Sequence, residues 1–347
     1  MKVISIANQK GGCGKTTLAV NIAATLSNLG NETLLIDLDP QAHATFALGL
    51  SGKSSEHKTS YDIFRSRFNK ADIDFDGLVI SDREKLSFIP ANMMLSAAEI
   101  NLGGIDGAAA ILSQTLAHPY FEKYAYVVID SPPSFGFLTL NSMYAADVIL
   151  VPMDLSYFAF NGINGVYRVA SLLNRETGRS PSIFFAMNLF DSRSNFARKI
   201  EKDARSKLGE YLLSTKIRSS VRLREAASEG KTIFEYADES PSASDFINLT
   251  CEILVAESKK TNAIMKEFML HAPEAGAVYV LGDFNNWQKT EANRLTKLEN
   301  GHWSGHVTLR RGKYRYKFLV DDEWIHDPEN RKVSANGYGT HDSIVKV

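Results

Sequence analysis

The chain has 347 residues, and its 39 lysines and arginines against 40 aspartates and glutamates leave a formal net charge of −1 at pH 7. No apolar run is long enough to cross a bilayer and the N-terminus lacks the layout of a signal peptide, so we expect a cytoplasmic protein without a membrane partner. Its length favours two domains, and its two distant cysteines, Cys13 and Cys251, suit neither a disulfide framework nor a metal cluster.

The first predicted elements are a strand at 3–7, a glycine-rich loop and a helix from Thr16 to about Leu29. A loop in this place turns backbone N–H groups and a helix N-terminus toward an anion. Lys15 is expected to reach the outer phosphates of a nucleotide and the Thr16 hydroxyl to bind Mg²⁺. The predicted nucleotide contacts of the loop are Gly11, Gly12, Cys13, Gly14, Lys15, Thr16 and Thr17. The general phosphate-loop pattern fails at Gln9, and Lys10 adds a second lysine.

Further along the chain, short runs rich in Val, Ile and Leu alternate with longer helical stretches. Strands are predicted at 33–39, 86–89, 126–130, 148–152 and 183–188, and helices at 158–177, 192–209 and 241–260. Near-continuous apolar strands between helices indicate a parallel sheet covered on both faces. The predicted fold class of residues 1–260 is therefore an α/β P-loop NTPase.

Polar residues follow three of these strands. Asp39 is well placed to orient or deprotonate an attacking water, and Asp37 and Asp130 are candidate magnesium residues beside Thr16. An aspartate that ends a buried strand can also be a plain turn residue. Asn188 ends the strand at 183–188, where an adenine contact and a structural amide are both open.

Positive charge gathers in residues 193–231, which hold eleven Lys and Arg against five Asp and Glu. A surplus of this size marks either a surface that faces phosphates or a solvated helical face.

After about residue 260 the pattern changes to short alternating strands separated by Gly, Asn and Asp turns. This pattern predicts a small all-β, immunoglobulin-like sandwich over 264–347. A two-residue hairpin loop at 321–322 would pair Leu319 with Trp324 and Lys317 with His326. Trp324 then shares a face with Lys317, opposite the apolar face of Tyr316, Phe318 and Val320. An indole beside a lysine suits a glucose ring, whereas packing of the tryptophans on a neighbouring element is the alternative.

The motifs KGGCGKTT, LLIDLDPQAHAT and VVIDSPPS resemble the three phosphate-site motifs of the ParA/Soj/MinD partition ATPases, over about residues 1–258. The resemblance implies a deviant Walker A loop, ATP and Mg²⁺ as cofactors, and slow hydrolysis to ADP and phosphate until a partner protein stimulates it. It also implies a homodimer formed on ATP, in which Lys10 touches the partner's nucleotide. Lys10, Lys15 and Asp39 are then the catalytic residues.

The segment VRLREAASEGKTI resembles the ParA/Soj branch, whose ATP-loaded dimers bind DNA without sequence preference. The resemblance assigns Arg222 and Lys231 to that contact, and Arg218 and Arg224 add charge beside them. A proline of the family is replaced at Arg218-Ser219, which puts an adenine-side contact in doubt. Nucleoid association follows from this resemblance.

The segments VYVLGDFNNWQ and YRYKFLVDDEWIHDPENRKV resemble the glycogen-binding module of the AMP-activated kinase β subunit. The resemblance implies that an α-glucan such as glycogen or amylose is bound, and the residues it assigns to the contact are Trp287, Lys317, Trp324, Thr340 and Asp342. Asp342 replaces an asparagine of that module, and a carboxylate accepts hydrogen bonds but cannot donate them as an amide does. This difference leaves the sugar affinity open.

Three functions are compatible with these motifs. The leading hypothesis is a DNA-binding ParA-like ATPase that positions or partitions a cargo through its α-glucan-binding module. The alternative is a conventional partition ATPase for a plasmid or chromosome, whose β module binds a protein or supports the dimer. A metabolic enzyme that transfers phosphate to a small substrate is the third, although no acceptor motif is apparent.

Overall fold

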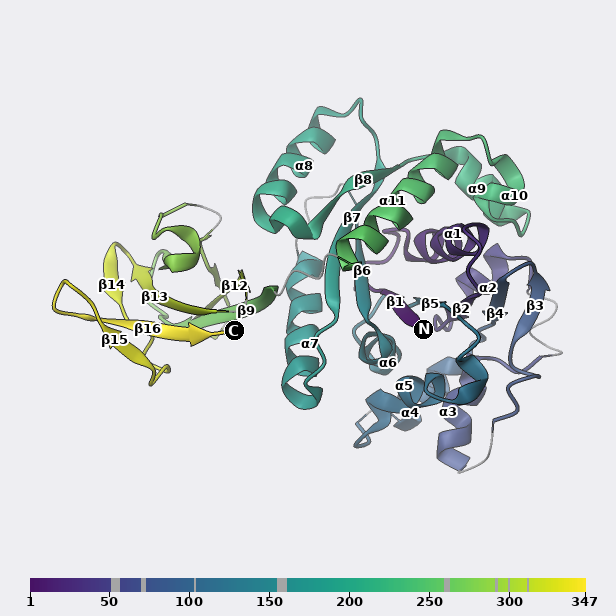
Figure 1. Cartoon of the computed structure of the whole chain (residues 1–347), viewed down its shortest axis with the longest axis horizontal. Helices are drawn as coiled ribbons and strands as arrows, with labels where there is room; N and C mark the ends of the chain where they lie inside the picture. The colour runs from purple at the N-terminus through teal and green to yellow at the C-terminus, as the bar shows by residue number, and fades with distance from the viewer. Residues whose placement is uncertain are drawn as a thin grey trace. The chain divides into compact units, whose positions relative to one another are not determined.

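The computed structural model describes residues 1–50, 57–69, 73–102, 104–154, 161–258, 263–290, 293–298, 300–310 and 312–347. The chain divides into two compact units, Met1–Ser258 and Lys259–Val347 (Figure 1). In the described part of the chain, every helix is too short or too polar to span a membrane.

The first unit is built on an eight-stranded sheet in the order β3-β4-β2-β5-β1-β6-β7-β8. All neighbouring strands are parallel except the edge pair β3 and β4, which is antiparallel. The strands are β1 (Lys2–Ile6), β2 (Thr33–Asp37), β3 (Ile80–Arg83), β4 (Leu86–Ile89), β5 (Tyr126–Asp130), β6 (Val148–Met153), β7 (Ser182–Phe190) and β8 (Leu212–Arg218).

One predicted strand needs a new end, and two strands were not predicted. The predicted strand 33–39 ends at Asp37, because the Asp39 amide turns back and donates to the Asp37 carboxylate. The sequence did not reveal β3 and β8, which form the two edges of the sheet. Both carry polar residues, ISDR in β3 and LLSTKIR in β8, because an edge strand needs no continuous apolar run.

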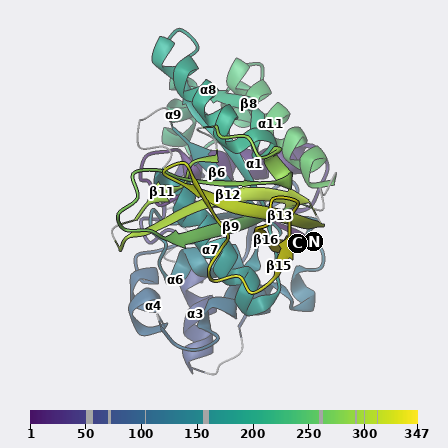
Figure 2. The same ribbon diagram turned by 90° about the vertical axis from the view of Figure 1, so that its left-hand side faces the viewer.

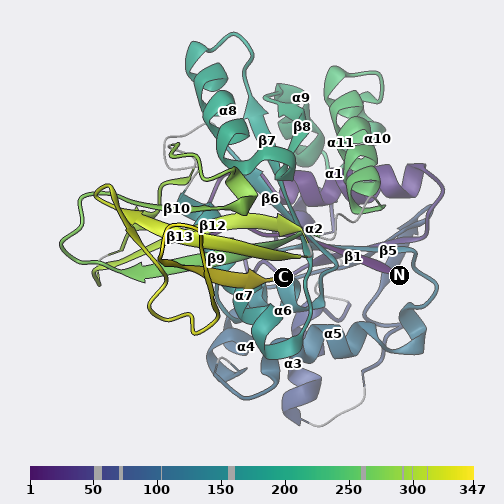
Figure 3. The same cartoon turned by 60° about the vertical axis from the view of Figure 1, so that its left-hand side comes forward.

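Helices cover both faces of this sheet (Figure 3). They are α1 (Lys15–Asn28), α2 (His43–Ala47), α3 (Ser60–Asn69), α4 (Leu95–Leu102), α5 (Ile111–Leu116), α6 (Phe137–Ala145), α7 (Asn161–Thr177), α8 (Asn195–Leu208), α9 (Val221–Ser228), α10 (Ile233–Ala237) and α11 (Pro241–Ser258). The predicted helix 192–209 begins only at Asn195, since the Ser194 hydroxyl caps it by accepting from the Ala197 amide. Residues 158–160 and 259–260 of two predicted helices lie outside the described residues.

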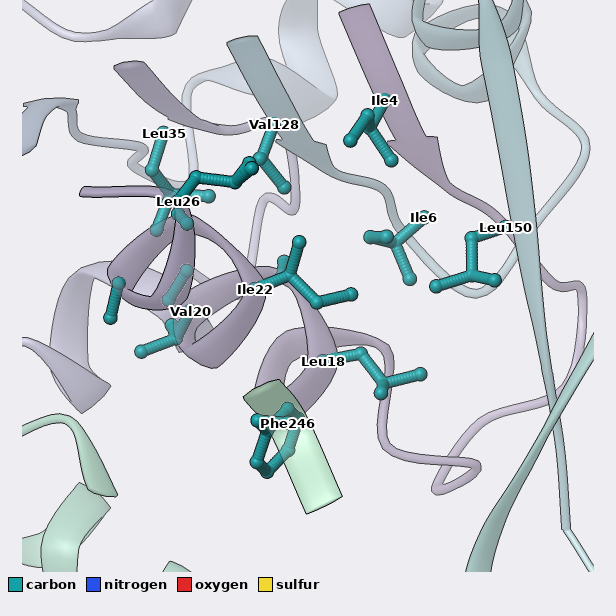
Figure 4. Packing of buried hydrophobic residues seen from close by; sticks show 14 of the residues in the cluster. Ile4, Ile6, Leu18, Val20, Ile22, Leu26, Leu35, Val128, Leu150 and Phe246 are labelled. Carbon is teal, nitrogen blue, oxygen red and sulfur yellow. The ribbon is translucent and has the colours of Figure 1, made fainter. Parts of the chain in front are cut away.

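The core on one face of the sheet is organised by α1 (Figure 4). Leu18, Ile22 and Leu26 follow each other at four-residue spacing, so they share one side of the helix and point at the strands. Ile6 on β1 and Phe246 on α11 belong to the same buried cluster. A second cluster on the other face contains residues from α3, α4, α5 and α6. Burial on both sides explains the near-continuous apolar strands.

The second unit contains two antiparallel sheets, in the orders β10-β13-β16-β15, with β14 on β13, and β11-β12-β9. Several of these strands, among them β9, β12, β13 and β16, are labelled in Figure 2. Their strands are β9 (Ala263–His271), β10 (Val278–Gly282), β11 (Thr296–Lys297), β12 (His302–Arg310), β13 (Lys313–Val320), β14 (Glu323–Ile325), β15 (Val333–Ala335) and β16 (His341–Lys346). Val280, Tyr316 and Phe318 of one sheet share a core with Phe268 and Trp303 of the other. The predicted α/β sheet and all-β sandwich are both confirmed.

The hairpin between β13 and β14 has the predicted register. Leu319 pairs with Trp324 across a turn in which Asp321 and Asp322 both have positive φ. β14 ends at Ile325, so the predicted pairing of Lys317 with His326 was wrong.

Candidate functional sites

The glycine-rich loop lies where β1 ends and α1 begins, and Gly14 is the position that permits its shape. Gly14 has φ 83°, and a Cβ atom there would lie 2.2 Å from Nδ2 of Asn188. That amide donates to the Cys13 carbonyl at 2.8 Å, so the side chain of Asn188 supports the loop from β7. The structural role of Asn188 is therefore visible, and its adenine contact stays a prediction.

The two lysines of the loop have different surroundings. Lys15 is only 7% exposed and donates from Nζ to the Lys10 carbonyl at 3.0 Å. Nζ of Lys10 forms an ion pair with Asp154, the residue directly after β6. The backbone amide of Lys10 donates to the side-chain oxygen of Asn8. The sequence did not point to Asp154, although its position after a buried parallel strand was a usable signal.

A carboxylate oxygen without a partner lies beside the loop. Asp130 is fully buried, and its Oδ2 accepts from the Thr16 hydroxyl at 2.7 Å. Its Oδ1 has no hydrogen-bond partner in the part of the chain that the structure describes. Oxygen ligands of this kind suit Mg²⁺, which keeps several waters and binds through one or two carboxylates and substrate phosphates. Thr16 and Asp130 therefore fit the predicted magnesium site.

Asp37 lies next to Asp130, since the two residues are register partners on β2 and β5. Its carboxylate accepts from the Thr45 amide at 2.9 Å, the Thr45 hydroxyl at 2.8 Å and the Asp39 amide at 2.9 Å. These bonds fix the turn that follows β2 and use both oxygens of Asp37. The structure thus gives Asp37 a structural task, and its part in holding magnesium stays a prediction.

Burial raises the pKa of Asp37 to about 6, against the opposing effect of its hydrogen bonds from Thr45 and Asp39. Burial also raises the pKa of Asp130 well above its usual range, and the neighbouring charge of Asp37 adds to the rise. In the unfolded chain an aspartate releases its proton near pH 4. Asp37 therefore contributes stability below about pH 4, and this contribution is lost as the pH rises through about 6.

We expect this titration to make the effect of magnesium on stability depend on pH. Mg²⁺ with ATP should raise the melting temperature more at about pH 7.5 than at about pH 5, because cation binding requires ionised carboxylates. Thermal unfolding with and without Mg²⁺ and ATP at both pH values measures the difference. Asp130→Asn, which keeps the shape but removes the charge, should reduce it. An equal rise at both pH values in the wild type would contradict the prediction.

Asp39, the predicted base, is held by its own turn. Its Oδ1 accepts from the Gln41 amide at 2.9 Å, and its Oδ2 lies 3.2 Å from Nδ1 of His43 on α2. Only 6% of the Asp39 side chain is exposed, against 61% for His43. His43 was not predicted from the sequence, although it stands four residues after Asp39 in a helix-starting segment.

The predicted DNA-contacting residues fall into two groups. Arg222 and Arg224 are exposed on α9, and Lys231 follows that helix and pairs with Glu229 at 2.8 Å. Arg218 is instead bound to Asp245 of α11 by two side-chain hydrogen bonds of 2.7 and 2.8 Å. Arg218 thus connects β8 to α11 while its side chain stays 54% exposed, and α9 and the residues after it add further exposed charge.

In the second unit the two predicted tryptophans come together. The rings of Trp287 and Trp324 have centroids 5.9 Å apart and an interplanar angle of 56°. Trp324 is 50% exposed. Trp287 has φ 59°, and its indole Nε1 donates to Asp283 at 3.2 Å, which fixes the ring orientation. The pair forms an angled apolar surface on one face of the sheet.

The predicted polar residues of this face bind one another. Lys317 is 7% exposed; it donates to the Thr340 hydroxyl at 2.7 Å and lies 3.5 Å from Asp342. Asn336, which was not predicted as a site residue, donates to both Thr340 and Asp342. Lys317 was expected to be an outer hydrogen-bond donor, but in the structure it is buried and its ammonium group is bound to Thr340 and Asp342. Tyr338, 92% exposed in the turn before β16, was also missed.

Comparison with known proteins supports both halves of this description. Residues 1–182 match the sequence model of a family described as an AAA domain, and residues 269–347 match that of the glycogen recognition site of AMP-activated protein kinase. Soj, the sporulation initiation inhibitor protein of Bacillus subtilis, is 33% identical over 253 residues, which are 73% of this chain and 98% of Soj. The chain belongs to the ParA/Soj family of partition ATPases. The chromosome partitioning protein ParA of Myxococcus xanthus is 32% identical over 263 residues, 75% of this chain and 90% of that ParA.

Solved structures agree with the assignment to the ParA/Soj family. A complex of a Cyanothece McdA variant with ATP has a TM-score of 0.64 at 25% identity, covering 73% of this chain and 96% of that one. Cobyrinic acid a,c-diamide synthase of Mycobacterium smegmatis, bound to an ATP analogue and magnesium, has a TM-score of 0.63 at 27% identity, covering 75% and 96%. As a member of the P-loop NTPases, this ParA/Soj-family chain carries the fold of an ATPase in its first unit.

Proposed function

We propose that the chain is an ATPase that dimerises on ATP, binds DNA without sequence preference and uses its second unit to tether an α-glucan cargo. The observation that carries the proposal is the fusion itself. One chain contains a ParA/Soj-type phosphate loop and a module whose paired tryptophans form an exposed apolar surface. The protein would then be located on the nucleoid.

The chemistry of the first unit follows from its own side chains. Lys15 and the loop amides would hold the outer phosphates, and Thr16 and Asp130 would hold Mg²⁺. When bound, Mg²⁺ would neutralise charge on the phosphate oxygens. The Asp39 carboxylate, oriented by the Gln41 amide, would position the attacking water and take its proton.

Lys10 supplies the link between ATP and the dimer. Its side chain is 31% exposed in the isolated chain, and its ammonium group is held by Asp154. In the proposed dimer Lys10 would leave Asp154 and contact the phosphates bound by the partner subunit. The nucleotide would then be held by both subunits, so its hydrolysis would release them.

The DNA contact would use Arg222, Arg224 and Lys231, whose exposed charges suit a phosphate backbone. Two copies of this short segment in a dimer would double the number of cations. A stimulating partner protein would accelerate the slow hydrolysis and so remove the dimer from DNA.

One observation favours a second candidate function. Lys317 and Asp342 bind each other and are almost fully buried, so fewer polar groups face a sugar. The second candidate is a conventional partition ATPase whose β module binds a protein or supports the dimer.

A bridging assay tests the leading proposal. DNA-coated beads should retain fluorescent glycogen only when the protein, ATP and Mg²⁺ are all present, because one dimer must bind both polymers. Lys10→Ala should abolish ATP-dependent retention and dimerisation, yet keep nucleotide binding, since Lys15 remains. Analytical ultracentrifugation follows the dimer in parallel. Retention of the protein on the DNA-coated beads without glycogen would support the second candidate and contradict the first.

A further inference from the structure

The face of the sheet that carries Trp324 extends to a group of exposed lysines. Residues paired across antiparallel strands share a face, and every second residue of a strand returns to it. Leu319 pairs with Trp324, so Lys313, six residues earlier on β13, lies on the same face. Lys346 pairs directly with Lys313. We name Lys313, Lys332 and Lys346 the basic edge of this face.

Lys332 joins this group through the neighbouring strand. Its carbonyl accepts from the Ile344 amide at 2.7 Å, which continues the register of β15 with β16. Ile344 in turn pairs with Arg315 on β13, so Lys332 and Arg315 share the face of Trp324. The basic edge is therefore contributed by three adjacent strands or strand extensions.

The charges on this face are balanced everywhere except at the basic edge. Lys317 lies 3.5 Å from Asp342, and Arg315 lies 3.3 Å from Asp283. The three lysines of the basic edge are exposed, and no ion pair of theirs occurs among the described residues. Like charges directly opposite on a sheet are destabilising, as for Lys313 and Lys346. A bound anion would relieve this repulsion.

We propose that the basic edge binds phosphate monoesters carried by an α-glucan whose sugar rings stack on Trp287 and Trp324. This inference rests on the proposed glucan binding and adds the chemical class of the polymer. At about 3.3 Å per residue, Lys313 lies roughly 20 Å along the strand from Leu319. One glucan chain of several units spans that length, so the same polymer reaches both the aromatic pair and the basic edge. Lysine ammonium groups act as point charges for phosphate without requiring one fixed orientation.

The test compares phosphorylated amylopectin with the same polymer after phosphatase treatment, using the full chain. We expect the wild type to bind the phosphorylated polymer about threefold to tenfold more tightly, since two or three exposed charge contacts each contribute little. The preference should decline with added salt. Lys313→Gln/Lys346→Gln should remove the preference while leaving the affinity for the dephosphorylated polymer unchanged. Lys266→Gln, at an exposed lysine of β9 in the other sheet, serves as the matched control and should keep the preference for the phosphorylated polymer.

The outcomes separate this inference from the proposed function. Equal affinity of the wild type for both polymers would overturn the phosphate site and leave glucan binding standing. Binding to neither polymer would overturn glucan binding and the phosphate site together. If Lys313→Gln/Lys346→Gln weakens DNA binding and leaves the glucan preference intact, the basic edge faces nucleic acid and the inference is wrong.

Discussion

Asp39→Ala is expected to bind ATP and to hydrolyse it about 10²- to 10⁴-fold more slowly than the wild type, the range typical of a lost general base. The side chain is 6% exposed and held by the Gln41 amide, so its position is fixed before any nucleotide arrives. Removing it leaves Lys15, Thr16 and Asp130 in place, and these are the groups expected to determine nucleotide affinity. The variant should therefore accumulate as an ATP-bound dimer.

Single-turnover hydrolysis and nucleotide affinity, measured on the same samples, check this prediction. Asp76→Ala is the matched control, because it removes the same charge from an exposed position on the first unit. A wild-type rate in Asp39→Ala would show that another group activates the water. His43 is the first candidate for that group, since its Nδ1 is 3.2 Å from the Asp39 carboxylate.

Trp287→Ala/Trp324→Ala is expected to lose detectable binding to glycogen and amylose, and each single substitution to weaken it at least about tenfold. Tryptophans at the centre of a binding surface commonly contribute about 2 kcal/mol or more each. The effect should be large here because the polar residues of this face, Lys317 and Asp342, satisfy each other and leave stacking as the main contact.

Co-sedimentation with both polymers measures this loss. Phe196→Ala provides a matched control, since Phe196 is exposed to the same 50% as Trp324 but lies on α8 of the first unit. If the wild-type protein stays in the supernatant, the proposal that the second unit binds glucan is wrong. The second unit would then be a protein-binding or dimer-supporting module.

Much of the fold was accessible from the sequence because buried elements leave regular patterns. The central strands are apolar on both sides, and the register of β13 with β14 follows from a two-residue turn. The edge strands β3 and β8 were not accessible, because their exposed polar residues obey no such pattern. The exact end of β2 depended on a hydrogen bond that the backbone amide of Asp39 donates to the Asp37 carboxylate, which propensity does not encode.

The candidate sites were predictable only where a motif fixes the backbone. The loop, Thr16 and Asp130 meet as expected, because strand ends and a helix start determine their positions. The partners of long side chains were less predictable. The pairing of Lys10 with Asp154 joins residues 144 positions apart, and the pairing of Arg218 with Asp245 joins residues 27 apart. Both depend on the tertiary arrangement of β6, β8 and α11.

The contact between Lys10 and Asp154 also determines how the proposed dimer responds to protein concentration. Each subunit must break one ion pair before its Lys10 can reach the partner's nucleotide. The free energy of breaking that pair is therefore lost twice for every dimer formed. At about 0.2–1 kcal/mol for a partly exposed pair, the total of about 0.4–2 kcal/mol raises the dissociation constant of the dimer roughly twofold to thirtyfold. In the proposed dimer, Asp154 would therefore shift assembly with ATP to higher protein concentrations.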